Sequence, residues 1–387
     1  MIITVIIPTY NEEENIEILV TLLEEKFKLF PNYIFNILFV DGNSKDNTVA
    51  FIKKAQKDFK NIKLIEEQEK SGLGGAYIKG FRFAMKELSS DYVVEMDADL
   101  QHNPDDFPKL VEKISAGFDM VIGSRYVKGG SVPKEWAIYR KFISYFGSLF
   151  ARVVLRIFKV KDFTSGFRLT KVAGVLDQIE FSKIKSKGFA YKMDMLVRIY
   201  DMKAKITEVP ISFGLRDRGT SKMEQRNFRD SLKVVVDFAL ERNKNFIKFM
   251  VVGFGGLFTD LGMFYLAKNY FNFIDNLSQS LNGAISPLAL ASFISGTTAM
   301  IFTFSLNNLW SFKERMRISL IKIIPVFILY SASSYVPILL RSSFIHYLEG
   351  IYGDNSFIIY SGFMAGVVFG IFWNYTVYSK IIWKKNG

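Results

Sequence analysis

The sequence predicts an α/β domain with a doubly wound, mostly parallel sheet, followed by an all-α transmembrane domain. Up to about residue 215, short β-rich runs alternate with amphipathic helical stretches, which is the pattern of a mostly parallel sheet covered by helices. From about residue 245, long apolar segments replace this alternation and charged residues become sparse. The change in pattern indicates two domains, which is the number that 387 residues allow.

In the first domain, each expected strand is a short run rich in apolar and β-branched residues. The strands are expected at 4–9, 36–40, 62–65, 92–96, 120–122 and 206–211, with helices between them that include 12–30, 46–57 and 76–88. Asn11 is a plausible N-cap, and three glutamates follow it where they complement the helix dipole. The first apolar run lacks a preceding basic region, so it indicates a strand and not a signal peptide.

Composition and charge narrow the classes of function. The chain is 49% hydrophobic and 16% aromatic, with a formal net charge of +12, which favours an anionic partner such as a nucleotide or a phospholipid headgroup. We expect no nucleic-acid partner, because no nucleic-acid-binding motif is present. The absence of cysteine excludes disulfides and thiolate chemistry. With two histidines, His102 and His346, a Ser-His-Asp hydrolase is poorly supported.

Four apolar segments in the second domain are each long enough to cross a bilayer. They cover about 247–267, 285–310, 318–340 and 358–383. Lysine and arginine gather before the first segment, between the second and third, and after the fourth. The positive-inside rule therefore predicts an integral membrane protein with four spans, in which both termini and the N-terminal domain are cytoplasmic.

Two amphipathic stretches connect these domains. Residues 136–161 carry bulky apolar side chains among Arg140, Lys141, Arg152 and other cations, and 224–244 is a second candidate. Such helices commonly lie in the membrane interface, although packing on the sheet is the alternative. We therefore expect a domain over 1–215, a connecting loop and helix over 216–245, and a membrane domain over 246–387.

A cluster of oxygen-bearing side chains follows the fourth expected strand. Asp97, Asp99 and Gln101 lie within five residues, and carboxylate and amide oxygens are ligands that Mg²⁺ or Mn²⁺ accepts beside a diphosphate. The position suits a ligand, because open α/β sheets bind ligands at the carboxyl ends of strands. The alternative is a polar loop in which Asp99 caps the next helix.

Three further loops end at the same expected edge of the sheet. The first strand leads into 8–12, the second into 41–48, and Gly72-Leu73-Gly74-Gly75 opens a helix. Taken alone, each of the first two is a turn or a helix cap as readily as a ligand contact. The glycine loop matches neither the P-loop nor the dinucleotide fingerprint.

Together these segments resemble a known family. Pro8 to Glu12, Asp41 to Thr48, Gly72-Leu73-Gly74, Asp97 to Pro104 and Gly123 to Tyr126 occur in the order found in inverting glycosyltransferases with a GT-A fold. Asp162 to Arg168, Met193 to Met195, Glu208 to Phe213, Arg216, and Gly219 to Lys222 extend the similarity to dolichyl-phosphate mannose synthases. This resemblance covers about 1–230, and 246–383 is similar to a GtrA-type four-span module.

The resemblance implies transfer of mannose from GDP-mannose to dolichyl or other polyprenyl phosphate, with a divalent metal ion, Mg²⁺ or Mn²⁺. It implies roles for specific residues: Asp99 and Arg125 in catalysis; Asp97, Asp99 and Gln101 at the metal; Pro8, Tyr10, Glu12, Asp41, Gly72, Gly74, Asp97 and Ala98 at the nucleotide sugar; and Arg140, Arg216 and Lys222 at the acceptor phosphate.

Departures from the family pattern leave alternatives open. Gly42 stands where a second acid is usual, Gly75 replaces a frequent threonine, and Ser165-Gly166 reverses the usual Gly-Ser order. Another donor such as UDP-glucose therefore remains an alternative. A flippase or transporter for a lipid-linked sugar is a different class of function, and the isolated Asp260 in the first span is the feature that points to it.

Overall fold

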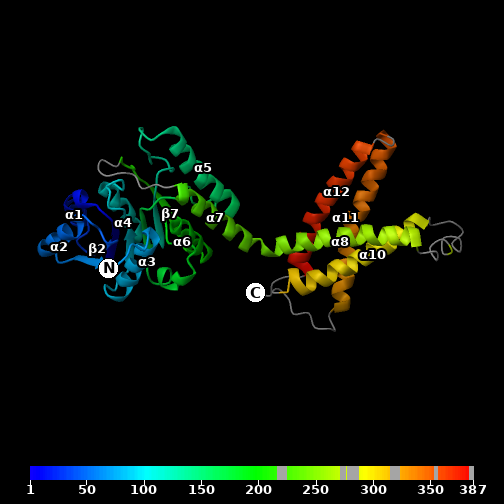
Figure 1. The fold of residues 1–387 in the computed structure, drawn as a ribbon, viewed down its shortest axis with the longest axis horizontal. Coiled ribbons are helices and arrows are strands. Elements are labelled where there is room, and N and C mark those ends of the chain that lie inside the picture. Colours follow the sequence, from blue (N-terminus) through cyan, green and yellow to red (C-terminus); the bar gives the residue numbers. More distant parts are fainter. Residues whose placement is uncertain (216–224, 271–275, 277–286, 314–322, 353–355, 383–387) are drawn as a thin grey trace. The chain divides into compact units, whose positions relative to one another are not determined.

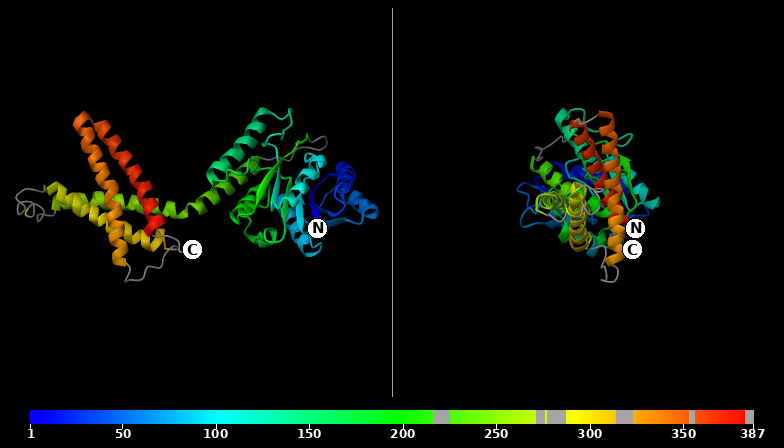
Figure 2. Two further views of the ribbon diagram at one scale, coloured as in Figure 1. Left: turned by 180° about the vertical axis from the view of Figure 1, so that it is seen from behind. Right: turned by 90° about the vertical axis from the view of Figure 1, so that its right-hand side faces the viewer.

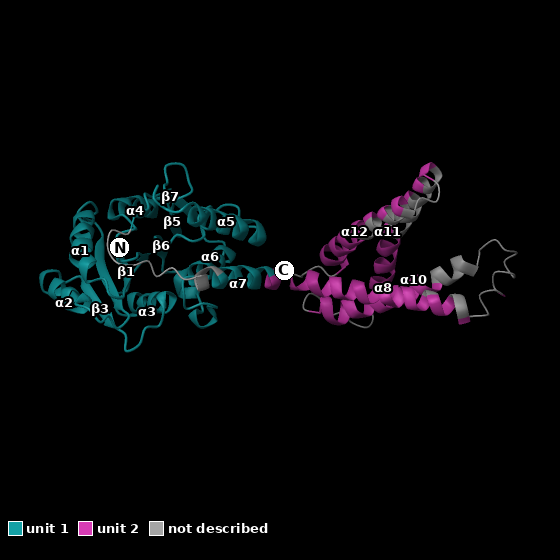
Figure 3. Ribbon diagram, turned by 45° about the horizontal axis from the view of Figure 1, so that its top comes forward, with its two compact units in different colours: residues 1–239 teal, residues 240–387 magenta. Residues whose placement is uncertain are grey.

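The computed structural model describes residues 1–215, 225–270, 276, 287–313, 323–352 and 356–382. The chain divides into two units, Met1–Ala239 and Leu240–Gly387, which Figure 3 colours separately. This division lies near the change of sequence pattern at about residue 245. The three-part division with limits at 215 and 245 remains a prediction.

A mixed sheet organises the first unit. Its strands are β1 (Ile2–Thr9), β2 (Ile34–Asp41), β3 (Ile62–Glu66), β4 (Tyr92–Glu95), β5 (Met120–Ser124), β6 (Arg168–Lys171) and β7 (Ile206–Pro210). The spatial order is β3-β2-β1-β4-β6-β5-β7. All neighbouring strands pair in parallel except β6, which is antiparallel to both β4 and β5. Six of these strands were predicted, and β6 was not.

Helices cover both faces of this sheet (Figure 1). They are α1 (Glu13–Phe27), α2 (Thr48–Asp58), α3 (Leu73–Lys86), α4 (Phe107–Ser115), α5 (Ile138–Leu155), α6 (Tyr191–Asp201) and α7 (Gln225–Arg242). Apolar residues of α1, α2 and α4 form one core with Ile3, Val5 and Ile7. Residues of α3, α5, α6 and α7 form another core, which contains the intervening Ile6. Adjacent residues of β1 thus enter opposite cores, as the pleat of a strand requires.

The strand directions bring the loops of interest to one edge. Because β4 and β5 are both antiparallel to β6, they run in the same direction as each other and as β1 and β2. The loops that follow these four strands therefore leave from the same edge of the sheet. Asp97 follows β4, and Arg125 directly follows β5, with β6 lying between the two strands.

The second unit is helical. Its described helices include α8 (Lys244–Tyr270), α10 (Pro287–Leu306), α11 (Ile323–Tyr352) and α12 (Ser356–Val377). Figures 1 and 2 show α8 beside α10, and α11 beside α12. Within the described ranges, Lys244–Ala267 has the length and hydropathy to cross a membrane. The four predicted spans overlap these helices, but their number and orientation stay a prediction.

Polar groups in this unit bond across its helices. The Ser295 hydroxyl of α10 donates to Asp260 Oδ1 of α8 at 2.7 Å, so the isolated acid has a neutral partner. Tyr330 of α11 donates to Thr303 Oγ1 at 2.9 Å and stacks on Tyr378. The contact with Ser295 accounts for Asp260 as a residue that joins two helices, and it does not require a transported ligand.

Candidate active site

The acidic loop after β4 turns sharply because Leu100 adopts a left-handed conformation, with φ of 60°. Within this turn the backbone N–H of Gln101 donates to Asp99 Oδ1 at 3.2 Å. The Gln101 side-chain amide donates to the carbonyl of Gly214 at 3.2 Å, which leaves its Oε1 as an acceptor. The predicted oxygen donors Asp97, Asp99 and Gln101 thus follow the central strand β4 in one ordered turn.

Asp97 is held from the protein interior on both carboxylate oxygens. The Tyr77 hydroxyl of α3 donates to Oδ1 at 3.0 Å, and the Lys192 ammonium of α6 lies 3.4 Å from Oδ2. Burial alone would raise the pKa of Asp97, but the charge of Lys192, the field of His102 and the hydrogen bond from Tyr77 together outweigh burial, and the pKa falls to about 2. Asp97 is therefore a carboxylate throughout the physiological range.

His102 supports the backbone of Asp97 from the protein interior. It is 1% exposed, its ring stacks on Phe167, and its Nδ1 accepts a hydrogen bond from the backbone N–H of Asp97 at 3.0 Å. Burial lowers the pKa of His102 to about 4, so the imidazole is neutral at neutral pH. A buried neutral ring whose Nδ1 is occupied orients Asp97 and is poorly placed to remove a proton from a substrate.

The donor set fits a divalent cation that is shared with a ligand. Within the part of the chain that the structure describes, no three His, Cys, Asp or Glu side chains converge. Asp97, Asp99 and Gln101 therefore offer two carboxylates and one amide oxygen. Mg²⁺ is commonly bound by one or two carboxylates together with substrate phosphates, so the residues fit an ion whose remaining ligands come from a diphosphate.

The loops after β1 and β2 are fastened to each other. Asp41 is 1% exposed; its carboxylate accepts hydrogen bonds from Thr9 Oγ1 at 2.9 Å and from the Ser44 N–H at 2.8 Å. Glu12 accepts from Asn15 Nδ2 at 2.8 Å, and its own N–H donates to Thr48 Oγ1. Asp41 and Glu12 thus shape the loops in which they lie.

Lys70 lies beside both Tyr10 and Gly42 in these loops. The Lys70 ammonium lies 3.6 Å from the centroid of the Tyr10 ring, a cation–π contact. A Cβ added to Gly42 would make ordinary contacts, the nearest with Lys70 Cγ at 3.4 Å. Pro8 pairs with Val40 in the sheet register, and Ala98 is buried beside the acidic turn. The nucleotide-sugar residues predicted from this region are therefore gathered at one edge.

The glycine loop is packed against the segment that precedes α6. Gly72 has φ of 82°, and a Cβ at this position would lie 2.7 Å from the Lys187 carbonyl oxygen. The N–H groups of Gly74 and Gly75 donate to the same carbonyl, at 2.8 and 3.3 Å. Two backbone amides at the start of α3 are therefore bonded within the protein and are not available to an anion.

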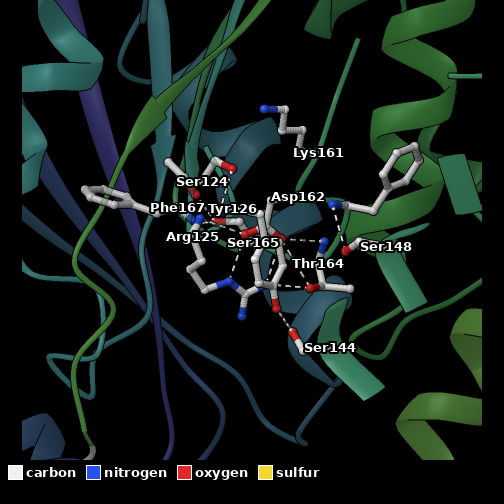
Figure 4. Close-up of polar contacts among 12 residues, drawn as sticks. Ser124, Arg125, Tyr126, Ser144, Ser148, Lys161, Asp162, Thr164, Ser165 and Phe167 are labelled. Carbon is white, nitrogen blue, oxygen red and sulfur yellow. Dashed lines mark hydrogen bonds and ion pairs between the residues drawn. The ribbon is translucent and has the colours of Figure 1, made fainter. Parts of the chain in front are cut away.

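Arg125 is bound to Asp162 by a two-pronged ion pair (Figure 4). Its Nε donates to Asp162 Oδ2 at 2.8 Å and its Nη2 to Oδ1 at 2.7 Å, while Thr164 Oγ1 accepts from Nη2. Both ionic residues are buried. Burial alone would raise the pKa of Asp162, but the Arg125 guanidinium beside it holds that pKa below its usual range.

Neighbouring carboxylate and hydroxyl groups hold this ion pair in place. The Glu208 carboxylate of β7 accepts hydrogen bonds from the N–H groups of Lys161 and Asp162 at 2.8 and 2.9 Å. The Ser165 hydroxyl donates to the Gly123 carbonyl. The loop that carries Asp162 is therefore tied to both β5 and β7, and Arg125 presents its cation from a rigid position.

Arg140 lies on α5, near the same edge. Its guanidinium stacks 4.0 Å from the centroid of the Trp136 ring, and its Nε is buried with no hydrogen-bond partner. Burial lowers the pKa of Arg140, and the charges of Arg125 and Asp99 also act on it. Two arginines and an acidic turn thus come within electrostatic range of one another. Arg216 and Lys222 lie outside the described residues.

Sequence reasoning missed the residues that support the acidic turn from inside. Tyr77 and Lys192 belong to α3 and α6, where their types match ordinary helix composition. Asp162 was noticed as part of a motif without a role. The one available signal was that Tyr191-Lys192-Met193-Asp194 places charges among apolar residues, and every one of these side chains is buried.

Comparison with known proteins matches both halves of the chain. Residues 4–175 match the family model for glycosyl transferase family 2, and 248–383 match that for the GtrA/DPMS transmembrane domain. The dolichol-phosphate mannosyltransferase of Pyrococcus furiosus is 34% identical over 324 residues, which cover 82% of this chain and 83% of the relative.

Two bacterial relatives match a shorter part of the chain. The polyprenol monophosphomannose synthase of Mycolicibacterium smegmatis is 35% identical, over 61% of this chain and 86% of its own length. The undecaprenyl-phosphate mannosyltransferase of Micrococcus luteus is 38% identical, over 58% of this chain and 88% of its own length. All three names describe transfer of mannose to a polyprenyl phosphate.

Proposed function

Because this chain belongs to glycosyl transferase family 2 and carries a GtrA/DPMS transmembrane domain, we propose that it transfers mannose from GDP-mannose to dolichyl or another polyprenyl phosphate. The reaction inverts the anomeric carbon and takes place at the cytoplasmic face of a membrane. The observation that carries the proposal is the 34% identity to the Pyrococcus furiosus mannosyltransferase, which extends over 82% of this chain and so includes both units.

The chemistry of the acceptor agrees with the residues present. An oxygen of the acceptor phosphate bonds to the anomeric carbon while the bond from that carbon to the donor diphosphate breaks, and GDP leaves. A phosphate monoester has its second pKa near about 6, so the acceptor needs no strong general base at neutral pH. A buried neutral His102 is consistent with such a reaction.

At the donor side, Asp99 and Gln101 would hold a divalent ion, Mg²⁺ or Mn²⁺, with Asp97 contacting the ion or the ribose. When bound, such an ion neutralises charge that develops on the departing diphosphate. Pro8, Tyr10, Glu12 and Asp41 would surround the base and ribose, with Gly72, Gly74 and Ala98 beside them. The rigid loops at this edge would hold the donor in one orientation.

At the acceptor side, cations would hold the lipid phosphate. Arg125 is fixed by Asp162 and would stabilise charge near the reacting centre. Arg140 has an unbonded Nε that suits an anionic oxygen. Arg216 and Lys222 are proposed for the same role from the sequence.

The first helix proposed to lie at the membrane interface is α5. It exposes a run of large apolar side chains beside its basic residues: Ile138, Tyr139, Phe142, Tyr145, Phe146, Phe150 and Val153. An exposed apolar face with flanking cations suits an anionic lipid surface. We further propose four spans with both termini cytoplasmic, from the positive-inside pattern.

A donor panel tests the proposal. Full-length protein in detergent is supplied with a short-chain polyprenyl phosphate and, separately, with GDP-mannose, UDP-glucose and other nucleotide sugars, each with and without EDTA. We expect transfer from GDP-mannose that EDTA abolishes and Mg²⁺ or Mn²⁺ restores. Transfer from UDP-glucose and from no other nucleotide sugar would show that UDP-glucose is the donor and GDP-mannose is not. An absence of transfer from every donor, with folded protein, would overturn the proposal.

A further inference from the structure

Lys192 is a buried cation to which the proposed reaction gives no role. It is 1% exposed, and its ammonium lies 3.4 Å from Asp97 Oδ2 and 4.9 Å from the centroid of the Phe189 ring. Burying a cation is costly unless an opposite charge accompanies it. Its position beneath Asp97 therefore calls for an explanation in terms of that carboxylate.

Gly166 is the residue that admits the Lys192 ammonium to this position. A Cβ built at Gly166 would lie 1.9 Å from Lys192 Nζ and 2.9 Å from its Cε. Any side chain at 166 would therefore push the ammonium away. Ser165, on the other hand, uses its hydroxyl to bond the Gly123 carbonyl. The order Ser165-Gly166 thus leaves room for the Lys192 ammonium, which a side chain at 166 would displace.

The contact changes the charge that a cation would meet at the acidic turn. Tyr77 bonds Asp97 Oδ1, and Lys192 faces Oδ2, so both oxygens are engaged from inside. The negative charge of Asp97 is balanced by an ammonium in direct contact. Because no three His, Cys, Asp or Glu side chains converge among the described residues, a cation at the turn would meet few protein carboxylates besides those of Asp97 and Asp99.

We propose that Gly166 and Lys192 provide an internal counter-charge for Asp97, which keeps divalent-cation affinity low until the diphosphate of the nucleotide arrives. The inference rests on the proposed metal-dependent function. Lys192 is a positioning residue, because it acts through Asp97. Lys192 balances the negative charge of Asp97, and the nucleoside diphosphate supplies the further negative charge that a divalent ion needs. The ion and the nucleotide therefore bind together.

Direct binding of Mn²⁺ tests the inference without measuring turnover. Full-length protein in detergent is titrated with Mn²⁺ with and without GDP, and free Mn²⁺ is measured by electron paramagnetic resonance. For Lys192→Met, we expect nucleotide-free Mn²⁺ affinity to rise about tenfold, because a nearby positive charge is removed. The enhancement of affinity by GDP should shrink by a similar factor.

Gly166→Ala disturbs the same contact between Lys192 and Asp97 without replacing the lysine. The substitution keeps the lysine but displaces its flexible end, so it should also raise nucleotide-free affinity. If both act through one ammonium, the double variant should match Lys192→Met alone. Lys54→Met removes an exposed cation paired with Glu17, and Gly147→Ala adds a Cβ that meets nothing within 4 Å. Both are matched controls and should leave affinity unchanged.

The outcomes separate the inference from the proposed function. If wild-type protein binds no Mn²⁺ even with GDP, the proposed metal dependence fails. If it binds Mn²⁺ with GDP, but neither substitution raises nucleotide-free affinity, the counter-charge is overturned and the metal role stands. Weaker binding under both conditions would assign Lys192 a purely structural role. If Lys192→Met does not fold, Gly166→Ala alone decides.

Discussion

The two units of the molecule treat buried polar groups differently. The first unit accompanies its buried cations with acids: Arg125 with the buried Asp162, and Lys192 with the partly exposed Asp97. Among the described residues of the second unit, the buried polar side chains in helices are neutral, and they include Ser295, Asn307 and Ser334. The Tyr330 hydroxyl donates to Thr303 Oγ1, and the Tyr378 hydroxyl is hydrogen-bonded to that of Ser334.

This difference in buried polar groups indicates different roles for the two units. A buried ion pair often returns less free energy than its desolvation costs, but a diphosphate and a lipid phosphate require charges at fixed positions. A membrane penalises charge most strongly, so hydroxyl and amide contacts suit a helical unit in lipid. We therefore expect substitutions of charge in the first unit to affect transfer, and substitutions of hydroxyls in the second to affect stability.

The largest effect is expected for Asp99→Ala. The substitution removes the carboxylate proposed to hold the ion at the donor diphosphate, and the transfer rate should fall about 10³-fold. It should leave the protein folded and membrane-associated, because Asp99 lies in a loop at the sheet edge. Incorporation of labelled mannose into lipid measures the rate, and the melting temperature serves as control. Metal-dependent turnover in the variant would remove Asp99 from the site.

Asp162→Asn should be the most destabilising of these changes. It leaves the buried Arg125 guanidinium without its counter-charge, which costs about 3 kcal/mol of unfolding free energy. Thermal melts in detergent measure the loss. Asp105→Asn is the matched control, since this acid is 67% exposed and pairs with Lys26 at the surface; it should cost less than about 1 kcal/mol.

The same ion pair predicts a pH dependence. Because the pKa of Asp162 is lowered in the folded protein, its contribution to stability is complete above its ordinary value of 3.8 and is lost as the pH falls through the folded-state pKa. The difference in stability between wild type and Asp162→Asn should therefore shrink in acid. A constant difference from neutral pH to pH 3 would contradict the ion pair as its source.

Arg140→Ala should have a smaller and more selective effect. Losing a charge-assisted contact to the acceptor phosphate should raise the acceptor KM about tenfold, with the donor KM unchanged. Lys141→Ala is a neighbouring control, because its ammonium bonds the Lys134 carbonyl instead. Equal effects of the two substitutions would indicate general attraction to the membrane and not a specific phosphate contact.

The smallest effect on transfer is expected for Tyr378→Phe in the second unit. The substitution removes the hydrogen bond between Tyr378 and Ser334 and should lower stability by about 1 kcal/mol. Transfer to a short-chain acceptor in detergent should stay within about twofold of wild type. A large loss of rate without a loss of stability would show that the helical unit takes part in the chemistry.

How far the sequence predicts this GT-A-like mixed sheet depends on the range of the interactions involved. Strands such as β1 and β4 are apolar runs, and the polar residues after them mark strand ends, so local pattern finds both the strands and the acidic turn. Strand β6 has four residues, Arg168-Leu169-Thr170-Lys171, and two are charged. It exists because β4 and β5 pair with it although they lie more than about 45 residues away along the chain, and no local sequence pattern reports such pairing.

The interior of the site was harder to predict for the same reason. Lys192 lies on a helix where a lysine usually faces water, and its inward position depends on an absent side chain at Gly166. Arg125 was expected at the reacting centre, and the structure adds that Asp162 holds its guanidinium. Pairwise contacts between distant segments, and not residue types, decide which cations are buried.

The antiparallel strand β6 has a consequence for how the enzyme can change over evolution. Neighbouring strands lie about 4.8 Å apart, so β6 spaces the ends of β4 and β5 by about 10 Å. The acid that follows β4 and the arginine that follows β5 inherit this interval from backbone hydrogen bonds. Point substitutions can replace the acid after β4 or the arginine after β5, but they leave the distance between these two strand ends unchanged. Specificity for the donor and specificity for the acceptor can therefore change independently while the sheet stays the same.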